Sequence, residues 1–243
     1  MNEDFSADYK TEIEERVNEI LIKSRIIKKF PFECFSLIDE IGKEIAIKLL
    51  PFSWIEEHGQ KAENVVSSKD AEAVEQCGRY IIFYNQDMPS PRLAFSVAHE
   101  IGHIVLGHDI ERITEYRKKN DSRFNQLYER SEIEANYFAA CLLMPEAVIN
   151  RLKSLGCCIT KEFLQGSFGV SEAAAEIRVK TLRRNSYRYV SYWNKDKSLD
   201  SAVLLKFSDF IKKTAPRRKT YDEEYRYEEK MQEERNRWLA EGY

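Results

Sequence analysis

The chain has 243 residues, of which 43% are hydrophobic and 33% charged, and its net charge is -3. This length allows one domain or two, with a proper hydrophobic core. The near balance of 38 basic and 41 acidic side chains gives no electrostatic reason to expect direct binding to nucleic acid. Because no apolar stretch reaches the roughly 18 residues of a membrane span, no membrane partner is expected either.

The start of the chain and its cysteines indicate the compartment. The first ten residues, MNEDFSADYK, are polar and acidic, unlike the basic and then apolar start of a signal peptide. The cysteines are odd in number, and none lies in a C-x-x-C pair. Such cysteines are expected to be reduced and mostly buried, so we expect a cytoplasmic protein.

Helical spacing of apolar residues predicts a first helix over about 8–29, which Pro31 ends. A second helix is predicted over Phe35–Lys43, and a short apolar segment follows at Glu44–Leu50. Residues 56–78 are polar and weakly periodic. They are predicted to form loops, with a possible helix near Asp70–Cys77.

The middle of the chain has stronger signals. The aromatic and β-branched run Arg79–Tyr84 predicts a strand. A helix is predicted from Arg92 to about Leu106, where Gly107 stops it. A charged connection at 109–127 then leads to a helix over Ser131–Leu143.

Two or three short helices are predicted within 146–184, a strand over Tyr187–Trp193 and a helix over Ser201–Lys213. The charged tail from Pro216 is interpreted as a solvated or frayed helix, with a partner-docking helix as the alternative. The whole pattern predicts an α+β fold that is mainly helical, with a small sheet beside the helix at 92–106.

Three of the four histidines, His99, His103 and His108, lie close together. The first two belong to an H-E-x-x-H motif in which Glu100 follows the first histidine. On a helix, residues i and i+4 lie on the same face, so both imidazoles can reach one ion. Since zinc favours nitrogen ligands of this kind, the motif predicts a zinc site.

The helix around the motif is apolar on nearly every side, apart from a narrow stripe that holds Ser96, His99, Glu100 and His103. Such a helix should be buried, and buried polar groups need partners, which a metal would supply for the two histidines. The alternative is a pair of ordinary surface or core histidines. It explains neither the narrowness of the stripe nor the presence of Glu100 beside it.

Glu100 lies beside the two histidines but is angled away from them, so it can face a zinc-bound water rather than the ion. Zinc lowers the pKa of that water toward ~7, and a nearby carboxylate can take its proton and later protonate the leaving amine. The sequence therefore predicts a zinc peptidase with Glu100 as catalyst. For stabilising the tetrahedral intermediate, Tyr137 and His108 are candidates.

The third protein ligand is expected outside the motif. His108 is rejected as a ligand, because the metzincin positions after the second histidine hold Leu106 and Asp109. It is expected instead to cap the helix end or to support a ligand from behind.

The helix at 131–143 supplies better candidates. Glu132 shares a face with small residues that allow close approach, and Asn136, one turn on, could orient its carboxylate. Glu134 points the other way and stands three residues after Ser131, where a capping box would use it. We therefore predict Glu132 as the third ligand, with Glu129 as a weaker alternative.

At this point the sequence resembles the ImmA/IrrE metallopeptidases. The resemblance is carried by Arg92–His103 and by Glu132-x-x-Ala-Asn-x-x-Ala-x-x-Leu-Leu-Met-Pro145, with a weaker echo over Phe163–Leu182. It covers about residues 30–184. It implies a zincin-like core and a gluzincin-like Zn²⁺ site in which His99, His103 and Glu132 are ligands and Glu100 is the catalyst.

The resemblance also implies a substrate, a helix-turn-helix repressor of the phage-repressor type, whose cleavage releases transcription under stress or during mobile-element induction. Residues 1–30 are too short for a DNA-binding domain, so the repressor is expected to be a separate chain. We accordingly divide the chain into an N-terminal helix at 1–30, a zinc metallopeptidase domain at 31–184 and a C-terminal extension of unknown role at 185–243.

Two alternatives remain open at this point. The strand at 79–84 is either an edge strand that pairs with substrate backbone or an interior strand. The whole chain could instead be a non-proteolytic DNA-binding or regulatory module with a structural zinc, in which Lys161–Arg184 mimics a helix-turn-helix. Structural zinc sites are usually closed and rich in cysteine, and neither Cys77 nor Cys141 belongs to such a cluster.

Overall fold

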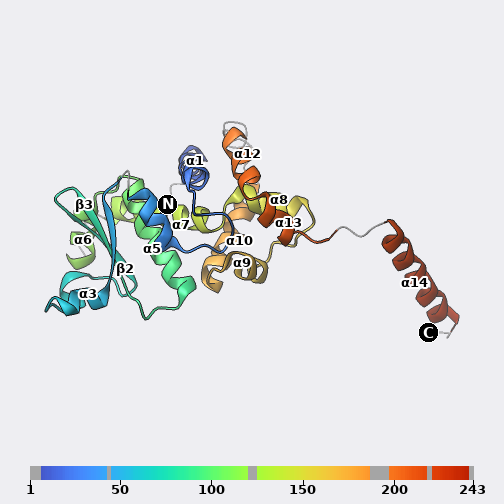
Figure 1. The fold of residues 1–243 in the computed structure, drawn as a ribbon. Helices are drawn as coiled ribbons and strands as arrows, with labels where there is room; N and C mark the ends of the chain where they lie inside the picture. The colour runs from blue at the N-terminus through green and yellow to red at the C-terminus, as the bar shows by residue number, and fades with distance from the viewer. Residues whose placement is uncertain (1–6, 43–44, 120–124, 187–196, 218–220, 241–243) are drawn as a thin grey trace.

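The computed structural model describes residues 7–42, 45–119, 125–186, 197–217 and 221–240. In these ranges the chain is mostly helical, with one three-stranded sheet. The sheet lies on one side of α5 and α7, and α8, α9, α10, α12 and α13 gather on the other side, with α14 beyond them (Figure 1). The predicted α+β, mainly helical fold is confirmed.

The first helix, α1 (Ala7–Lys23), packs against α7 and α12. Its apolar stripe of Ile13, Val17 and Leu21 is fully buried, as the helical spacing predicted. The predicted end near residue 29 is wrong. The carbonyls of Leu21 and Ser24 accept hydrogen bonds from the Nζ of Lys206, and the Ser24 hydroxyl accepts the N–H of Ile27 at 3.0 Å, so the helix stops at Lys23.

The helix α2 (Cys34–Ile41) comes next and confirms the second predicted helix to within two residues. The sheet then begins with β1 (Ile47–Pro51), followed by the short helices α3 (Phe52–Glu57) and α4 (Ala62–Val65). A small separate core of Ile55, Val66 and Phe83 holds α3 and α4 against the sheet.

The strand β3 (Arg79–Tyr84) has the predicted bounds and lies in the centre of the sheet, in the order β1-β3-β2. It is parallel to β1 and antiparallel to β2 (Ala71–Gln76). Of the two alternatives for this strand, the interior one is therefore confirmed and the edge strand is wrong. The edge strand on the side of α5 is β2.

The possible helix near 70–77 is also wrong, because this segment is β2. Its sequence, AEAVEQ, is rich in helix-forming residues. Cys77 and Gly78 follow it with φ of 51° and 71°, as a type I′ hairpin turn requires, and this turn folds β2 back onto β3. Pairing with β3 thus overrides the local helix propensity.

The helix α5 (Ser90–Val105) carries the histidine motif. It begins after Pro89, with Pro91 in its first turn, and ends where Gly107 adopts a φ of 71°. Val97, Ala98 and Ile101 are fully buried, which confirms that the motif lies on a buried helix.

The long helix α7 (Asn125–Leu143) runs along α5. It begins six residues before the predicted start, so Ser131 lies inside the helix and Glu134 has no capping role there. The two helices meet closely at Gly102, where an added Cβ would lie 3.0 to 3.2 Å from side-chain atoms of Phe138. Gly102 therefore sets the approach of the two helices.

This contact gives a test of the packing with a matched pair of substitutions. Gly102→Ala and Gly166→Ala both place alanine in a helix, but a Cβ at Gly166 meets nothing within 4 Å. We expect Gly166→Ala to raise the free energy of unfolding by about 0.5–1 kcal/mol through helix propensity. Gly102→Ala should lower it by about 1 kcal/mol through overpacking, as urea denaturation would show. Equal effects would contradict the close approach.

The charged connection predicted at 109–127 is in part a helix, α6 (Ile110–Lys119). Asp109 caps its start, with Oδ1 accepting the N–H of Arg112 at 3.0 Å. Ile110 and Ile113 are buried and anchor the helix beside β2.

Three helices follow α7 as predicted: α8 (Glu146–Ser154), α9 (Lys161–Phe168) and α10 (Glu172–Ser186). The predicted strand at 187–193 lies outside the described residues. The helix predicted at 201–213 is split into α12 (Lys197–Lys206) and α13 (Ser208–Thr214) by Phe207. Phe207 is fully buried with its ring 4.7 Å from that of Phe30, so this part of the chain joins the main core.

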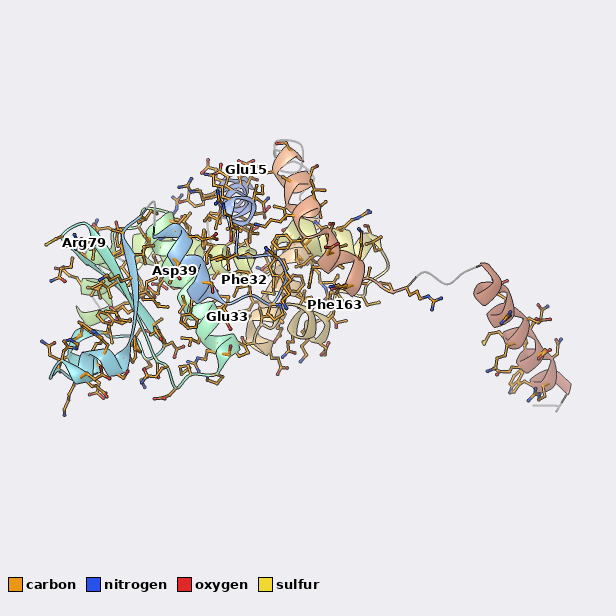
Figure 2. The ribbon with its side chains drawn as sticks, in the orientation of Figure 1. Glu15, Phe32, Glu33, Asp39, Arg79 and Phe163 are labelled. Carbon is orange, nitrogen blue, oxygen red and sulfur yellow. The ribbon has the colours of Figure 1, made fainter. Side chains whose placement is uncertain are left out.

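The last helix, α14 (Tyr221–Ala240), stands apart from the other elements (Figure 1). Figure 2 shows Arg79 in the sheet, at the start of β3, and Phe163 on α9 well away from it. The helix α14 lies still farther from the sheet. The side chains of α14 that the structure describes are exposed, in agreement with a solvated helix. Within the described ranges, no helix is long and apolar enough to cross a membrane.

The five cysteines are free thiols, and three of them, Cys34, Cys141 and Cys157, are buried. The division at residues 30 and 184 stays a prediction. In the structure, α1 packs on α7 and α12, and α12 packs on α8, so segments from all three parts share one core.

Candidate metal centre

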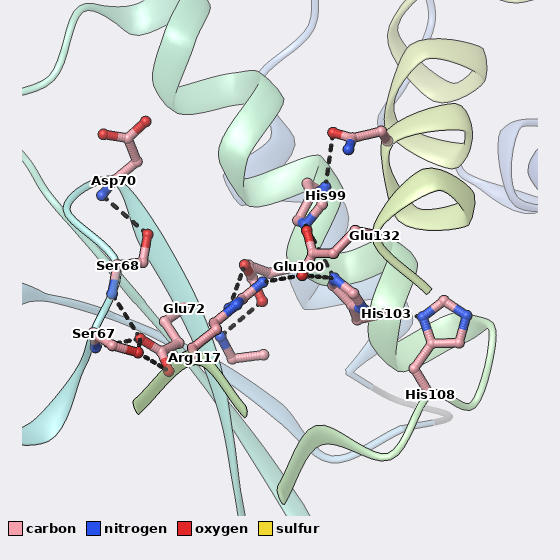
Figure 3. A network of polar contacts seen from close by, with 12 residues as sticks. Ser67, Ser68, Asp70, Glu72, His99, Glu100, His103, His108, Arg117 and Glu132 are labelled. Carbon is pink, nitrogen blue, oxygen red and sulfur yellow. Dashed lines mark hydrogen bonds and ion pairs between the residues drawn. The ribbon is translucent and has the colours of Figure 1, made fainter. Parts of the chain in front are cut away.

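Three predicted ligands converge at one point. His99 and His103 project from α5 and Glu132 from α7, and their donor atoms lie within 4.8 Å of one another. The Nε2 atoms of the histidines are 3.0 Å apart, and Glu132 Oε2 lies 3.2 Å from His99 Nε2. In the part of the chain that the structure describes, no other group of three such side chains converges in this way. Figure 3 shows the three side chains pointing toward one another.

The ionisation of these groups suits a divalent cation. Burial lowers the pKa of His103, although Glu132 acts in the opposite direction, so the ring is held in the neutral form that binds metal. Burial would raise the pKa of Glu132. The contacts with His103 and His99 and the charge of Arg117 outweigh burial and hold this pKa well below its usual range. Two imidazoles and a carboxylate form a donor set that zinc accepts.

Asn136 has a different partner from the one predicted. Its Oδ1 lies 3.1 Å from Nδ1 of His99 rather than beside the Glu132 carboxylate. The amide oxygen accepts the Nδ1–H of His99, which leaves Nε2 with a lone pair toward the other ligands. Asn136 lies one helical turn after Glu132 on α7, at the level of His99. It therefore orients His99 and not Glu132.

The remaining acidic and histidine candidates lie elsewhere. His108 is not at the point of convergence, and its Nδ1 lies 2.9 Å from Nδ1 of His103, on the side away from the metal-facing nitrogen. It supports a ligand, which is one of the two roles predicted for it. Glu129 is exposed and belongs to no group of converging ligands, whereas Glu134 is buried and contacts His108.

Glu100 lies beside the ligands and is only 3% exposed. Its Oε2 accepts the backbone N–H of Ala73 on β2 at 2.9 Å, and its Oε1 lies 3.3 Å from Nη1 of Arg117. The edge of the sheet thus holds the carboxylate that the motif places next to the histidines. Its position beside the cluster and outside the set of three donors suits a proton acceptor.

Arg117 on α6 was missed by the sequence analysis. Its guanidinium bridges two carboxylates, with Nη2 3.0 Å from Oε1 of Glu132 and Nη1 facing Glu100 (Figure 3). Burial opposes its charge, but Glu100 and Glu132 raise the pKa of Arg117 above its usual value. The available signal was the helical spacing of Ile110, Ile113 and Arg117 within a segment that looked merely charged.

Removal of the Arg117 bridge should destabilise the protein most when no metal is bound. Arg117→Gln leaves two nearby carboxylates without their shared cation, and we expect the metal-free protein to lose about 3 kcal/mol of its free energy of unfolding. A bound divalent cation neutralises Glu132, so the loss should be smaller with zinc present. Urea denaturation with and without zinc would measure both values. Equal losses in the two states would contradict the bridging role.

A cavity of about 600 Å³ opens beside the centre. Its walls include His99, Glu100, Arg117 and Glu132 together with residues at the start of β2. Neither Tyr137 nor His108 lines it, and Tyr137 is buried with its hydroxyl bonded to Glu14. Both are thus poorly placed to stabilise a tetrahedral intermediate, because that species would form in the cavity.

The rim of the cavity at the start of β2 is held rigidly. The buried carboxylate of Glu72 accepts the N–H of Ser68 at 2.8 Å, and Asp70 forms a two-point ion pair with Arg92 at 2.8 and 3.0 Å. The cavity lining also includes Tyr116 and Tyr128, whose rings stack with their centroids 4.0 Å apart. The cavity therefore borders the start of β2.

A centre of this kind, with a proton acceptor held next to converging histidine and carboxylate donors, is typical of metallopeptidases. Comparison with known families agrees. The model of peptidase family M78, described as the IrrE N-terminal-like domain, matches residues 48–180, which is more than half of the chain. The chain belongs to this metallopeptidase family, which confirms the resemblance drawn from the sequence. No curated protein matches it at a significant level.

Proposed function

We propose that this chain is a zinc-dependent endopeptidase in which His99, His103 and Glu132 hold the ion and Glu100 is the catalyst. The observation that carries the proposal is the convergence of the three donors beside Glu100 at the wall of a cavity. The donor set contains no cysteine and leaves one side of the cluster open to the cavity, as catalytic sites require.

A zinc ion bound there supplies a Lewis acid that polarises a peptide carbonyl and makes water a better nucleophile at neutral pH. Glu100 takes a proton from the attacking water and returns it to the leaving amine. The hydrogen bond from Ala73 fixes one oxygen of this carboxylate, so the other faces the cavity side, where Arg117 lies. The β2 strand thus positions the base.

The start of β2 at Ala71, where the strand borders the cavity, is the proposed docking site for an extended substrate segment. The backbone carbonyl of Asp70 accepts the N–H of Asn85, which follows β3. Along β2, the backbone N–H and C=O groups of every second residue therefore point toward β3, and those of the residues between them point away from it. Ala71 and Ala73 belong to the outward set; the N–H of Ala73 is bonded to Glu100, whereas Ala71 lines the cavity. A peptide added at this edge would pass the ligands.

The proposed substrate is a helix-turn-helix repressor of the phage-repressor type, supplied as a separate chain in the cytoplasm and cleaved to release transcription. Family membership supports this substrate class. The test is to incubate the zinc-loaded chain with the repressor encoded nearest to its gene and to identify fragments by mass spectrometry. Cleavage should stop with 1,10-phenanthroline and return with added zinc.

The outcomes separate the two parts of this proposal. Zinc-dependent cleavage of unfolded casein without cleavage of the repressor would retain the endopeptidase and remove the repressor. If the zinc-loaded chain cleaves neither protein, the endopeptidase itself is contradicted.

The alternative of a DNA-binding module is not favoured by the geometry. Arg178, at the centre of the basic helix that would face DNA, is completely buried, with Nε and Nη2 bonded to the carbonyl of Met144 at 3.1 and 2.9 Å. Its role is to hold the turn between α7 and α8. Retention of promoter DNA by this chain alone in an electrophoretic shift at stated salt would favour the alternative.

A further inference from the structure

A row of buried polar side chains lies behind His103, on the side opposite its metal-facing nitrogen. His103 Nδ1 lies 2.9 Å from His108 Nδ1, and His108 Nε2 lies 2.9 Å from Oε2 of Glu134. His103 is fully buried, and the side chains of His108 and Glu134 are 8% and 3% exposed. Figure 3 shows His103 between Glu132 and His108. The row thus joins a metal ligand on α5 to a carboxylate on α7.

The hydrogen-bond chemistry of this row assigns its protons. An ionised carboxylate only accepts hydrogen bonds, so Nε2 of His108 carries a proton and donates a hydrogen bond to Glu134. With that proton on Nε2, Nδ1 of His108 is placed to accept the Nδ1–H of His103 at 2.9 Å. This tautomer leaves Nε2 of His103 unprotonated, at the point where the donor atoms converge.

The row continues into the N-terminal helix. The Tyr9 hydroxyl on α1 donates to Oε2 of Glu134 at 2.7 Å, and the Arg130 guanidinium lies 4.6 Å from the centre of the Tyr9 ring. A second bond between these helices joins Tyr137 to Glu14. Because α1 lies outside the matched residues 48–180, nothing in the family domain itself accounts for these contacts.

We propose that His108 and Glu134 are positioning residues that fix the metal-binding tautomer of His103, and that Tyr9 makes the helix α1 part of the metal centre. The inference rests on the proposed metal site at His99, His103 and Glu132. The coupling is reciprocal: if α1 strengthens metal binding, bound metal must strengthen the packing of α1 against the centre to the same extent.

The test measures zinc binding by the full-length chain in competition with a chromophoric chelator, without reference to peptidase activity. His108→Phe keeps a ring of similar shape but removes the acceptor, and Glu134→Gln removes the charge. Both should weaken zinc binding about 10- to 100-fold, the usual effect of losing a group that orients a ligand. Tyr9→Phe removes only a hydroxyl and should weaken it a few-fold, by roughly half a decade. Arg16→Gln, at an exposed ion pair on α1, should leave it unchanged.

A second measurement reads the tautomer directly. Long-range ¹H–¹⁵N spectra of the metal-free wild-type protein should show His103 protonated at Nδ1, and His108→Phe should add the Nε2–H form. A merely structural role would leave this signature in place. Circular dichroism would check that each variant is folded, and Tyr9→Phe keeps the test decisive if a larger change unfolds the chain.

Two results would overturn the inference while the metal site stands: wild-type zinc affinity in folded Tyr9→Phe and His108→Phe, or an Nε2–H on His103 in the metal-free wild type. A wild-type chain that binds no zinc would overturn the inference and the proposed function together.

Discussion

Glu100→Gln is expected to reduce kcat/KM for peptide cleavage by about 10²- to 10⁴-fold, the usual contribution of a general acid–base group, with the zinc content unchanged. Glutamine cannot take the proton of the attacking water or return it to the leaving amine. Its amide oxygen can still accept the N–H of Ala73, so the local structure should persist. A fluorogenic peptide that the wild-type enzyme cleaves would serve as substrate. Turnover of this peptide and the zinc content would be measured on the same samples.

The amide nitrogen of the new side chain would face Arg117, which then keeps Glu132 as its remaining carboxylate partner. A small loss of stability is therefore compatible with the expectation. The matched control is Glu63→Gln, an exposed glutamate on α4 outside the cavity, which should leave turnover near the wild-type value. Wild-type turnover by zinc-loaded Glu100→Gln would rule out Glu100 as the catalyst.

The elements that carry the metal ligands could be predicted from the sequence because their signals are local. The helix α5 is bounded by proline and glycine, and its apolar residues surround the polar stripe. The strand β3 is a continuous aromatic and β-branched run, which matches its central place in the sheet. Three ligands could be proposed because a helix places His99 and His103 together and because Glu132 shares its face with small residues.

The missing parts of the site depend on contacts between distant segments. The strand β2 has the composition of a helix, and only its pairing with β3 makes it a strand. Its Ala73 N–H then holds Glu100, so the position of the base depends on an element that the sequence obscured. Arg117 and Tyr9 lie on amphipathic segments whose polar residues give no indication of their partners. Each finds its carboxylate only when α6 or α1 docks.

The capping assignment of Glu134 shows the same limit. The spacing from Ser131 fits a capping box, but α7 begins at Asn125, so the backbone N–H groups near Ser131 are already bonded within the helix. The side chain is instead turned toward His108 and Tyr9, each of which lies in another part of the fold. A local pattern predicted the wrong role, since the helix start was placed by composition alone.

The third ligand can be tested against its rival by a matched pair of substitutions. Glu132→Gln is expected to weaken zinc binding by more than about 100-fold, beyond the usual effect of changing a group that only orients a ligand. The amide oxygen keeps a hydrogen-bond acceptor for Arg117 but is a poor replacement for an ionised carboxylate. The metal-free protein should therefore remain folded, and peptidase activity should be lost at limiting zinc.

Glu129→Gln is the matched control, because Glu129 is one turn before Glu132 on α7 but is exposed and outside the converging donors. We expect its zinc affinity to stay within roughly two-fold of wild type, as for a surface change away from special features. Competition titrations of both variants would give the two dissociation constants under the same conditions. If Glu129→Gln weakens binding and Glu132→Gln does not, α7 holds the ion through the other carboxylate, and the geometry proposed for the centre is wrong.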